Sequence, residues 1–396
     1  GHIACDNITK LKNTGGNGMK ALISSIETDF PAQTPINFPI FPSAYVEDLD
    51  GDGIRDLVAS PSSTDIASNA LINLRQSNWF YRNEGTDIQP KFVYRQPDFL
   101  QDGMIDLGEN AAPALMDVDG DGDLDLFVGY GGTRTSTGYR ADIHFYRNTG
   151  NATQAKFELV ATDYLNLSNR LLSAENLLLV NTKPFFADLN GDGTIDFGFW
   201  ASTFKGIDIR FVPNTAPRGR AMQFDTTRLT KLVNPQNLAN GENLLYYDID
   251  QDGKLDILVS KNSGNVEFHH NTGTTLNPTY ELKSQVFGGL DVDFEKRSQG
   301  MVAADLNGDR QPELILGDLS GKVRVYQNFT KADAILKSDS SLIFNEYSGK
   351  PEFTKIGMGL FPAVGDLDGD QLPELLIGSN TGGIKFLKNT STKVII

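Results

Sequence analysis

Residues 117–125 read DVDGDGDLD, and this nine-residue pattern recurs with small changes so that the chain carries six copies of it. The copies begin at Asp48, Asp117, Asp188, Asp248, Asp305 and Asp366, at spacings of 69, 71, 60, 57 and 61 residues. The other five read DLDGDGIRD, DLNGDGTID, DIDQDGKLD, DLNGDRQPE and DLDGDQLPE. A repeat of this length, with short strands and Gly-rich turns, is typical of an array in which each copy forms one small sheet.

Each acidic segment lies between two apolar runs. Pro113–Met116 precedes the second copy and Leu124–Gly129 overlaps its end, which predicts two antiparallel strands joined by the acidic loop. A third strand is expected to end in a turn such as Phe145–Gly150 (FYRNTG), where Asn and Gly would supply the positive φ of a tight turn. Phe157–Val160 is expected to form a fourth strand. One copy therefore predicts a four-stranded propeller blade.

The predicted fold is all-β, a β-propeller of four-stranded antiparallel blades in a single domain over residues 1–396, with six blades favoured over seven. The repeat units are expected to begin near residues 42, 111, 182, 242, 299 and 360. Residues 8–30 are expected to complete the C-terminal blade, because Ile8–Gly15 matches a third strand with its turn and Met19–Ile26 matches a fourth strand. That exchange would close the ring and protect both edges. The alternative is a seventh blade with inner strands upstream of residue 1.

The acidic loops offer the ligands that calcium prefers. Ca²⁺ takes about six to eight oxygens in irregular geometry. Positions 1, 3 and 5 of the loop present side-chain oxygens, position 7 a backbone carbonyl and position 9 a carboxylate. An EF-hand would need a glutamate at position 12 and flanking helices, which this pattern lacks. The predicted ligands are Asp48, Asp50, Asp52, Ile54, Asp56, Asp117, Asp119, Asp121, Asp123, Asp125, Asp188, Asn190, Asp192, Thr194, Asp196, Asp248, Asp250, Asp252, Lys254, Asp256, Asp305, Asn307, Asp309, Gln311, Glu313, Asp366, Asp368, Asp370, Leu372 and Glu374.

The repetition of the acidic pattern favours calcium binding over the simpler hypothesis that the loops are solvated turns. Acidic or amide groups stand at the same offsets in six copies, and carboxylates so close together repel one another unless a cation lies between them. We expect up to six Ca²⁺ ions. Position 6 is glycine in most loops, as at Gly53, Gly122 and Gly193, and glycine permits a left-handed backbone. Arg310 and Gln371 stand there in the last two loops at a cost of about 1–2 kcal/mol, so 305–313 and 366–374 are expected to bind more weakly.

Composition excludes several other classes. The net charge is −16 and the Lys and Arg residues are scattered, which is not the charge pattern of a nucleic-acid-binding protein. No apolar run approaches the roughly 18–20 residues of a membrane-spanning helix. A single cysteine rules out an intrachain disulfide. Cys5 follows Ile3-Ala4, which resembles the end of a bacterial lipoprotein signal, so a lipid anchor at Cys5 is one hypothesis and an ordinary small apolar residue the other.

These residues resemble the FG-GAP or VCBS repeat family, which includes the integrin α-subunit head and many bacterial surface proteins. The resemblance runs from about residue 8 to residue 390 and extends past the acidic loops to the Tyr-Arg-Asn-Thr-Gly turn. It implies a propeller with calcium in loops on one face and a role in adhesion, ligand binding or assembly. Leu376–Gly378 keeps only the hydrophobic run and the glycine of the name-giving motif, which places the chain nearer the bacterial branch.

The leading functional hypothesis is a calcium-binding, non-catalytic binding or adhesion module exported from a bacterial cell, whether secreted, on the cell surface or in the periplasm. Its partner would be a protein or glycan ligand at the cell surface. Millimolar calcium outside cells suits sites of modest affinity.

A polysaccharide-active enzyme resembling lyases of acidic sugars is the alternative, and it would need a base and a charge neutraliser. His144, His269 and His270 lie in predicted third strands, where adjacent residues face opposite ways. No Ser-His-Asp arrangement or phosphate-binding glycine loop is recognisable, and no catalytic residue is assigned.

A lectin-like propeller is the third hypothesis. Exposed aromatic residues would be its mark, and Tyr130 and Tyr139, which flank the Gly-rich segment 131–138, are the candidates. Trp79 and Trp200 lie in predicted strands and are expected to pack in the core.

Overall fold

The computed structural model describes residues 6–16, 18–38, 42–61, 73–136, 138–235, 238–297, 300–339, 344–345, 348–351 and 355–390. Cys5, and with it the lipid-anchor hypothesis, lies outside the described residues. The chain divides into two compact units, residues 1–107 with 133–138 and residues 108–132 with 139–396. No helix among the described residues is long and apolar enough to cross a membrane.

The described residues of the first unit form a four-stranded antiparallel sheet and a hairpin. A short 3₁₀ turn, η1 (Leu74–Gln76), precedes the third strand of the sheet. The buried side chains of Ile36, Phe38, Leu57, Ala59 and Tyr81 form its core. The sheet consists of β3 (Ser43–Glu47), β4 (Asp56–Ser60), β5 (Trp79–Asn83) and β6 (Phe92–Gln96), and the hairpin of β1 (Lys10–Asn13) and β2 (Ile23–Glu27).

The N-terminal hairpin has the form of the outer half of a blade. The side-chain oxygen of Asn13 accepts hydrogen bonds from the backbone N–H groups of Gly15 and Leu22, both at 2.9 Å. Asn83 does the same between β5 and β6. However, β1 and β2 form a two-stranded sheet of their own, and the C-terminal sheet has three strands among the described residues. The completion of the C-terminal blade by residues 8–30 stays a prediction.

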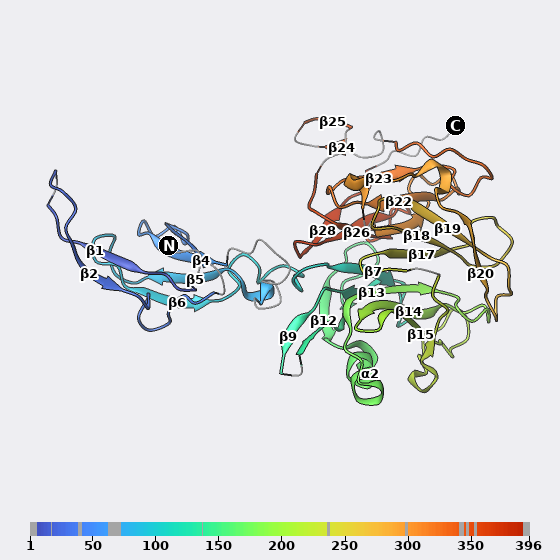
Figure 1. Ribbon diagram of the computed structural model, residues 1–396, viewed down its shortest axis with the longest axis horizontal. Coiled ribbons are helices and arrows are strands. Elements are labelled where there is room, and N and C mark those ends of the chain that lie inside the picture. The colour runs from blue at the N-terminus through green and yellow to red at the C-terminus, as the bar shows by residue number, and fades with distance from the viewer. Residues whose placement is uncertain are drawn as a thin grey trace. The chain divides into compact units, whose positions relative to one another are not determined.

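Among its described residues, the second unit has five antiparallel sheets of three or four strands (Figure 1). Three have four strands and two have three. In chain order they are β7 (Ala112–Met116), β8 (Asp125–Gly129), β11 (Ile143–Asn148) and β12 (Phe157–Ala161); β13 (Val180–Ala187), β14 (Asp196–Thr203), β15 (Gly206–Val212) and β16 (Thr230–Lys231); β17 (Asn243–Tyr247), β18 (Asp256–Ser260), β19 (Val266–Asn271) and β20 (Tyr280–Ser284); β21 (Gly300–Ala304), β22 (Glu313–Gly317) and β23 (Val323–Tyr326); and β26 (Leu360–Gly365), β27 (Glu374–Ser379) and β28 (Ile384–Leu387).

The remaining elements are short. The α-helix α2 (Leu167–Glu175) packs Leu167 and Leu171 into the core cluster that contains Phe127 and Phe197. The others are the hairpins of β9 (Thr133–Thr135) with β10 (Gly138–Arg140) and of β24 (Phe344–Asn345) with β25 (Lys350–Pro351), and the 3₁₀ turns η2 (Tyr164–Asn166), η3 (Thr226–Arg228), η4 (Phe287–Gly289) and η5 (Phe294–Lys296).

Burial follows the hydrophobic pattern of each blade. The second strands β8, β18 and β22 are buried along their whole length, which explains their unbroken apolar runs. The outer strands β12 and β20 are largely exposed. The four predicted strands per blade, and the acidic loop between the first two of them, are thus present in four of the described sheets.

The sheets of the second unit contact one another in cyclic order. Gly129 and Gly317, at the ends of β8 and β22, lie against Thr182 and Leu360 of other sheets. In the same way Gly378, at the end of β27, lies against Ala111, which precedes β7. The last sheet therefore touches the first sheet of this unit directly. The number of blades in the whole chain stays a prediction.

Candidate metal centres

Each acidic loop folds around the side chain of its first residue. In the loop 188–196, the carboxylate of Asp188 accepts hydrogen bonds from the backbone N–H groups of Gly191 at 2.7 Å and Gly193 at 2.9 Å. The side-chain oxygen of Asn190 accepts from Asp192 N–H at 2.9 Å, and that of Asp192 accepts from Thr194 N–H at 2.9 Å. Positions 1, 3 and 5 therefore all turn their oxygens inward on the loop.

The carboxylate at position 9 is the most buried ligand of each loop. Its exposed fraction is 0–1% for Asp56, Asp125, Asp196, Asp256, Glu313 and Glu374. One oxygen accepts the backbone N–H of position 2, as Asp125 does from Val118 at 3.3 Å. Burial raises the pKa of Asp125 and Asp196 to about 6 and that of Glu313 to about 7. A negative charge at these positions is disfavoured by burial until a cation compensates it.

Four of the six loops bring three carboxylates within 4.8 Å of one another among the described residues. The loops at 188 and 305 have Asn190 and Asn307 at position 3, so an amide oxygen stands in place of the third carboxylate. The four groups are Asp48, Asp50 and Asp56; Asp117, Asp119 and Asp121; Asp248, Asp250 and Asp256; and Asp366, Asp368 and Glu374.

Three carboxylate oxygens in these loops are buried and have no hydrogen-bond partner among the described residues. They are Oδ1 of Asp119, Oδ1 of Asp123 and Oε1 of Glu374. Asp123 stands at position 7 and is 8% exposed, and burial together with the neighbouring Asp121 raises its pKa. An unsatisfied buried carboxylate oxygen is costly, and these atoms are hard oxygen donors. The residues of these two loops therefore fit a calcium ion.

A basic side chain accompanies every aspartate at position 3. Arg82 Nε lies 2.8 Å from Asp50 Oδ2, and three further pairs have the same placement. In each, the basic residue immediately precedes the Asn that ends the third strand or its equivalent. The three are Arg147 with Asp119 at 3.1 Å, His270 with Asp250 at 3.2 Å and Lys388 with Asp368 at 2.8 Å.

The two loops with Asn at position 3 have uncharged residues at the matching place, Pro213 and Gln327. An aspartate at position 3 and a basic residue at its partner therefore occur together along the chain. Loops with Arg or Lys as the partner have one more carboxylate at positions 1, 3, 5 and 9, and one more cation, than loops with Asn at position 3. The two kinds of loop therefore carry the same net charge.

The loop backbone confirms the expected left-handed conformation at position 6. Gly53, Gly122 and Gly193 have φ of 83°, 96° and 85°. Arg310 and Gln371 adopt φ of 66° and 70° in spite of their side chains. Position 4 is also left-handed, which the sequence-based prediction did not include. Glycine at that position in five of the six copies was the signal that could have revealed it.

The Asn and Gly of the outer turn act differently from the prediction. Neither Asn148 nor Gly150 has positive φ. Instead the side-chain oxygen of Asn148 accepts from the N–H groups of Gly150 at 3.0 Å and Lys156 at 2.8 Å. A Cβ on Gly150 would meet the carbonyl oxygen of Gln154 at 2.1 Å, so glycine is needed there for close approach.

This turn is also tied to the acidic loop. The backbone N–H of Asn148 donates to Asp125 Oδ1 at 2.9 Å, and those of Asn83, Asn214 and Asn271 donate to the corresponding position-9 carboxylates at 2.8–2.9 Å. The buried carboxylate therefore joins the loop to the third strand before any ion binds.

The role predicted for position 7 stays a prediction. The backbone N–H groups of Ile54, Lys254 and Leu372 donate to the carboxylates at position 5, which orients this residue within the loop. The Lys254 ammonium also lies 2.7 Å from Asp252 Oδ2, so this loop holds an additional cation.

Two segments of the chain, residues 117–199 and 248–316, match the family model of the FG-GAP-like repeat. The chain carries FG-GAP-like repeats. The matched segments contain four of the six acidic loops. The acidic loops at 48–56 and 366–374 lie outside them, and in both the carboxylate of position 1 accepts the same backbone hydrogen bonds.

A comparison with curated proteins finds no match. Among solved structures, an Agrocybe aegerita lectin described as recognising non-reducing terminal N-acetylglucosamine is 17% identical, with 98% of this chain and 89% of the lectin covered and a TM-score of 0.34. A Trypanosoma rangeli sialidase in complex with sialic acid is 9% identical, with 98% of this chain and 58% of the sialidase covered and a TM-score of 0.38.

The histidines of the FG-GAP-like repeats lie in third strands, as predicted. His144 is buried, with its ring 5.6 Å from that of Tyr130. His269 Nε2 lies 3.1 Å from Glu267 Oε2, whereas His270 faces the acidic loop. The two adjacent histidine side chains therefore contact different groups.

The prediction that Tyr130 and Tyr139 contact a glycan is wrong for Tyr130. Tyr130 is 1% exposed, because its ring packs beside His144, and it offers no binding surface. Tyr139 is partly buried and donates its hydroxyl to Glu109 Oε1 at 2.7 Å. Trp79 packs against Phe38, and Trp200 is 3% exposed, so both are packing residues as expected.

Proposed function

We propose that this chain is a calcium-stabilised propeller module that acts by binding or adhesion outside the cell and is not an enzyme. Its second unit is a ring of five blades, and the acidic loops of the FG-GAP-like repeats hold Ca²⁺. The observation that carries the proposal is the set of buried carboxylate oxygens without partners at Asp119, Asp123 and Glu374.

The loops supply what a hard cation requires. In the loop 117–125, Asp117, Asp119, Asp121, Asp123 and Asp125 would hold the ion. Bound calcium would supply positive charge where burial and crowding of carboxylates oppose their ionisation. The chain itself provides the preformed shape, since the loop backbone already satisfies the side chains of positions 1 and 5.

The calcium affinity expected of these sites indicates whether the protein works inside or outside the cell. Calcium sites of extracellular modules have Kd values of about 10⁻⁴–10⁻³ M, and millimolar extracellular calcium fills sites of that strength. An exported binding or adhesion module is therefore the proposed setting. The ion would stabilise the repeats, leaving recognition to other surfaces.

The test is thermal unfolding of the full chain in millimolar calcium, in excess chelator and in magnesium. A ligand that binds only the native state raises its stability by RT ln(1 + [L]/Kd) for each site, so calcium should raise the Tm by several degrees or more, and magnesium by much less. Equal midpoints in calcium and chelator would remove the proposal.

A matched pair of variants assigns the effect to the loops. Asp121→Asn keeps the oxygen that accepts Asp123 N–H but removes one negative ligand, so the calcium-dependent rise in Tm should shrink. Asp102→Asn changes an exposed aspartate outside the acidic loops and should leave that rise unchanged.

A further inference from the structure

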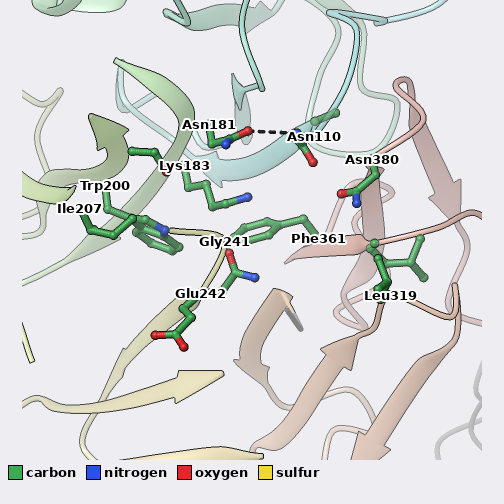
Figure 2. Close-up of a pocket in the computed structure, with 15 residues that line it drawn as sticks. Asn110, Asn181, Lys183, Trp200, Ile207, Gly241, Glu242, Leu319, Phe361 and Asn380 are labelled. Atoms are coloured by element: carbon green, nitrogen blue, oxygen red, sulfur yellow. Dashed lines mark hydrogen bonds between the residues drawn. The ribbon is translucent and has the colours of Figure 1, made fainter. Parts of the chain in front are cut away.

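The second unit has a pocket at the strand ends remote from its acidic loops (Figure 2). Ala111 lines it and precedes β7, whose other end leads into Asp117. Lys183 lines it near the start of β13, whose other end leads into Asp188. The cavity is about 130 Å³, well above the roughly 10–15 Å³ that one water requires. It is therefore a separate site that calcium binding does not occupy.

The pocket contains one cation without a counter-ion. Lys183 Nζ lies 4.5 Å from the centre of the Phe361 ring, and no carboxylate among the described residues pairs with it. Figure 2 shows its ammonium group directed into the pocket toward Phe361. Burial lowers the pKa of Lys183 to about 8, so it is still largely protonated at neutral pH.

The one carboxylate among the lining residues does not compensate Lys183. Glu242 Oε2 lies 2.7 Å from Lys261 Nζ and also accepts the backbone N–H of Ala239 at 2.9 Å. Figure 2 shows its carboxylate pointing away from Lys183. Lys183 and Glu242 are the titratable residues among those that line the pocket, so its interior keeps an uncompensated positive charge.

A second polar group in the pocket lacks a partner. Trp200 is 3% exposed, and its indole Nε1 has no hydrogen-bond acceptor among the described residues. In Figure 2 the nitrogen lies on the side of the ring that faces Lys183. A buried indole N–H usually finds an acceptor, so this donor favours a ligand that brings one.

Two asparagines at the pocket have strained backbones. Asn110 and Asn181 adopt φ of 59° and 51°, and Asn110 Nδ2 donates to Asn181 Oδ1 at 3.0 Å. Their backbones are fixed by other sheets, since Asn181 N–H donates to Gly131 O at 2.9 Å and Asn110 N–H to Asn380 O at 3.4 Å. Such strain is found where a site holds polar groups in set positions.

We propose that this pocket binds the carboxylate of a small sugar acid, with Lys183 as the cation and Trp200 as a hydrogen-bond donor. The inference deepens the proposed binding function by giving it a ligand class, and it uses none of the calcium ligands. The ammonium and the indole N–H supply donors for a carboxylate.

The amide side chains that line the pocket favour a sugar acid over other carboxylates. Asn110, Asn181 and Asn380 offer both donors and acceptors, which matches the hydroxyl groups of a sugar. Phe361 and Trp200 supply apolar ring surface beside them. A peptide carboxylate is the competing ligand class, and glycylglycine represents it in the test.

The experiment is calorimetric titration of the full chain with D-glucuronate at pH 7, repeated with Lys183→Met and with Lys205→Met. Lys205 lies in the exposed turn between β14 and β15 and is the charge-matched control. A hydrogen bond to a charged group is worth about ten- to a hundredfold in Kd, so Lys183→Met should lose at least tenfold while Lys205→Met binds like the parent. Acetate and D-glucose should each bind more weakly than D-glucuronate.

Several results would overturn the proposal. They are no binding of D-glucuronate at millimolar concentration, unchanged binding by Lys183→Met, or acetate or glycylglycine binding as tightly as D-glucuronate. Folding of Lys183→Met is checked by its Tm, which should not fall. Calcium-dependent stability without D-glucuronate binding would remove this inference alone, whereas D-glucuronate binding without calcium-dependent stability would remove the metal proposal alone.

Discussion

Arg82 Nε lies 2.8 Å from Asp50 Oδ2, and the same guanidinium reaches Asp52 Oδ2 at 3.0 Å. The pairing of a basic residue with position 3 recurs at Asp119, Asp250 and Asp368 and is absent from the sequence where position 3 is Asn. The basic side chain lowers repulsion within the loop of the metal-free protein. It also repels a calcium ion that enters the loop. It therefore lowers calcium affinity while it stabilises the metal-free loop.

Replacing Arg147 with methionine should separate these two effects. The variant loses the ion pair with Asp119 and should have a lower Tm in chelator. Its calcium affinity should rise by about tenfold or less, since pairs as exposed as this one contribute little. Scanning calorimetry in chelator and calcium measures both. Lys156→Met, which removes an exposed pair with Glu158 outside the loop, is the control, and a smaller calcium-dependent rise for Arg147→Met would contradict this account.

Arg310→Gly should stabilise the protein, because glycine accepts the φ of 66° without the side-chain penalty. The expected gain is about 1 kcal/mol in the free energy of unfolding, measured by urea denaturation. Gly193→Ala is the mirror experiment: a Cβ there meets nothing within 4 Å, so any loss reports backbone strain alone. A destabilised Arg310→Gly protein would mean that the arginine side chain makes a stabilising contribution.

The acidic loops and their flanking strands follow from the sequence because their cause is local. A carboxylate at position 1 needs N–H groups two to five residues later, and apolar runs on both sides need burial. The compensating cation could also have been found by comparing copies, since Arg147 and Lys388 occur with Asp at position 3 and Pro213 occurs with Asn.

The grouping of the sheets and the pocket could not be predicted in the same way. The contact of Gly378 with Ala111 joins residues far apart in the chain, and periodicity within one blade does not encode which sheets meet. The pocket draws Lys183, Trp200 and Phe361 from separate strands with no common spacing. Such sites depend on tertiary packing, which a repeat pattern leaves open.

Gly378→Ala tests the contact between the last and first sheets of the second unit. A Cβ at this residue would lie 2.0 Å from Ala111 O and 2.8 Å from Pro113 Cδ, so the two sheets would have to separate. We expect a loss of about 3 kcal/mol or more in unfolding free energy. Gly383→Ala, whose Cβ would meet nothing within 4 Å, should lose about 1 kcal/mol through its φ of 71°. Equal losses would show that the close contact is not required.

Asn148→Ala should destabilise the outer hairpin. The N–H groups of Gly150 and Lys156 lose their shared acceptor, at a cost of about 2 kcal/mol for partly buried donors. The backbone bond from residue 148 to Asp125 remains, so calcium affinity should change little. Chemical denaturation and calcium titration measure the two quantities. Thr149→Ala removes the exposed hydroxyl that bonds Lys156 O and Glu158 in the same hairpin and is expected to be nearly neutral. A large loss of calcium affinity would place Asn148 in the metal site instead.

Lys183 should make stability depend on alkaline pH. Burial lowers its pKa to about 8 in the folded protein, whereas an unfolded lysine titrates near about 10.4. Between these values the unfolded chain binds more protons, so the free energy of unfolding rises with pH from about 8 to about 10. The charged form is disfavoured below that range and both states are neutral above it.

Comparison with Lys183→Met isolates this contribution, because the other lysines and tyrosines titrate alike in both proteins. Urea denaturation at a series of pH values should show the parent gaining on the variant from about pH 8 to about pH 10. D-glucuronate should bind less tightly over the same range as the ammonium loses its proton. Lys205→Met should keep a constant difference from the parent. A constant difference for Lys183→Met as well would mean that its ammonium is solvated in the folded state, and the uncompensated charge on which the pocket's anion binding rests would be absent.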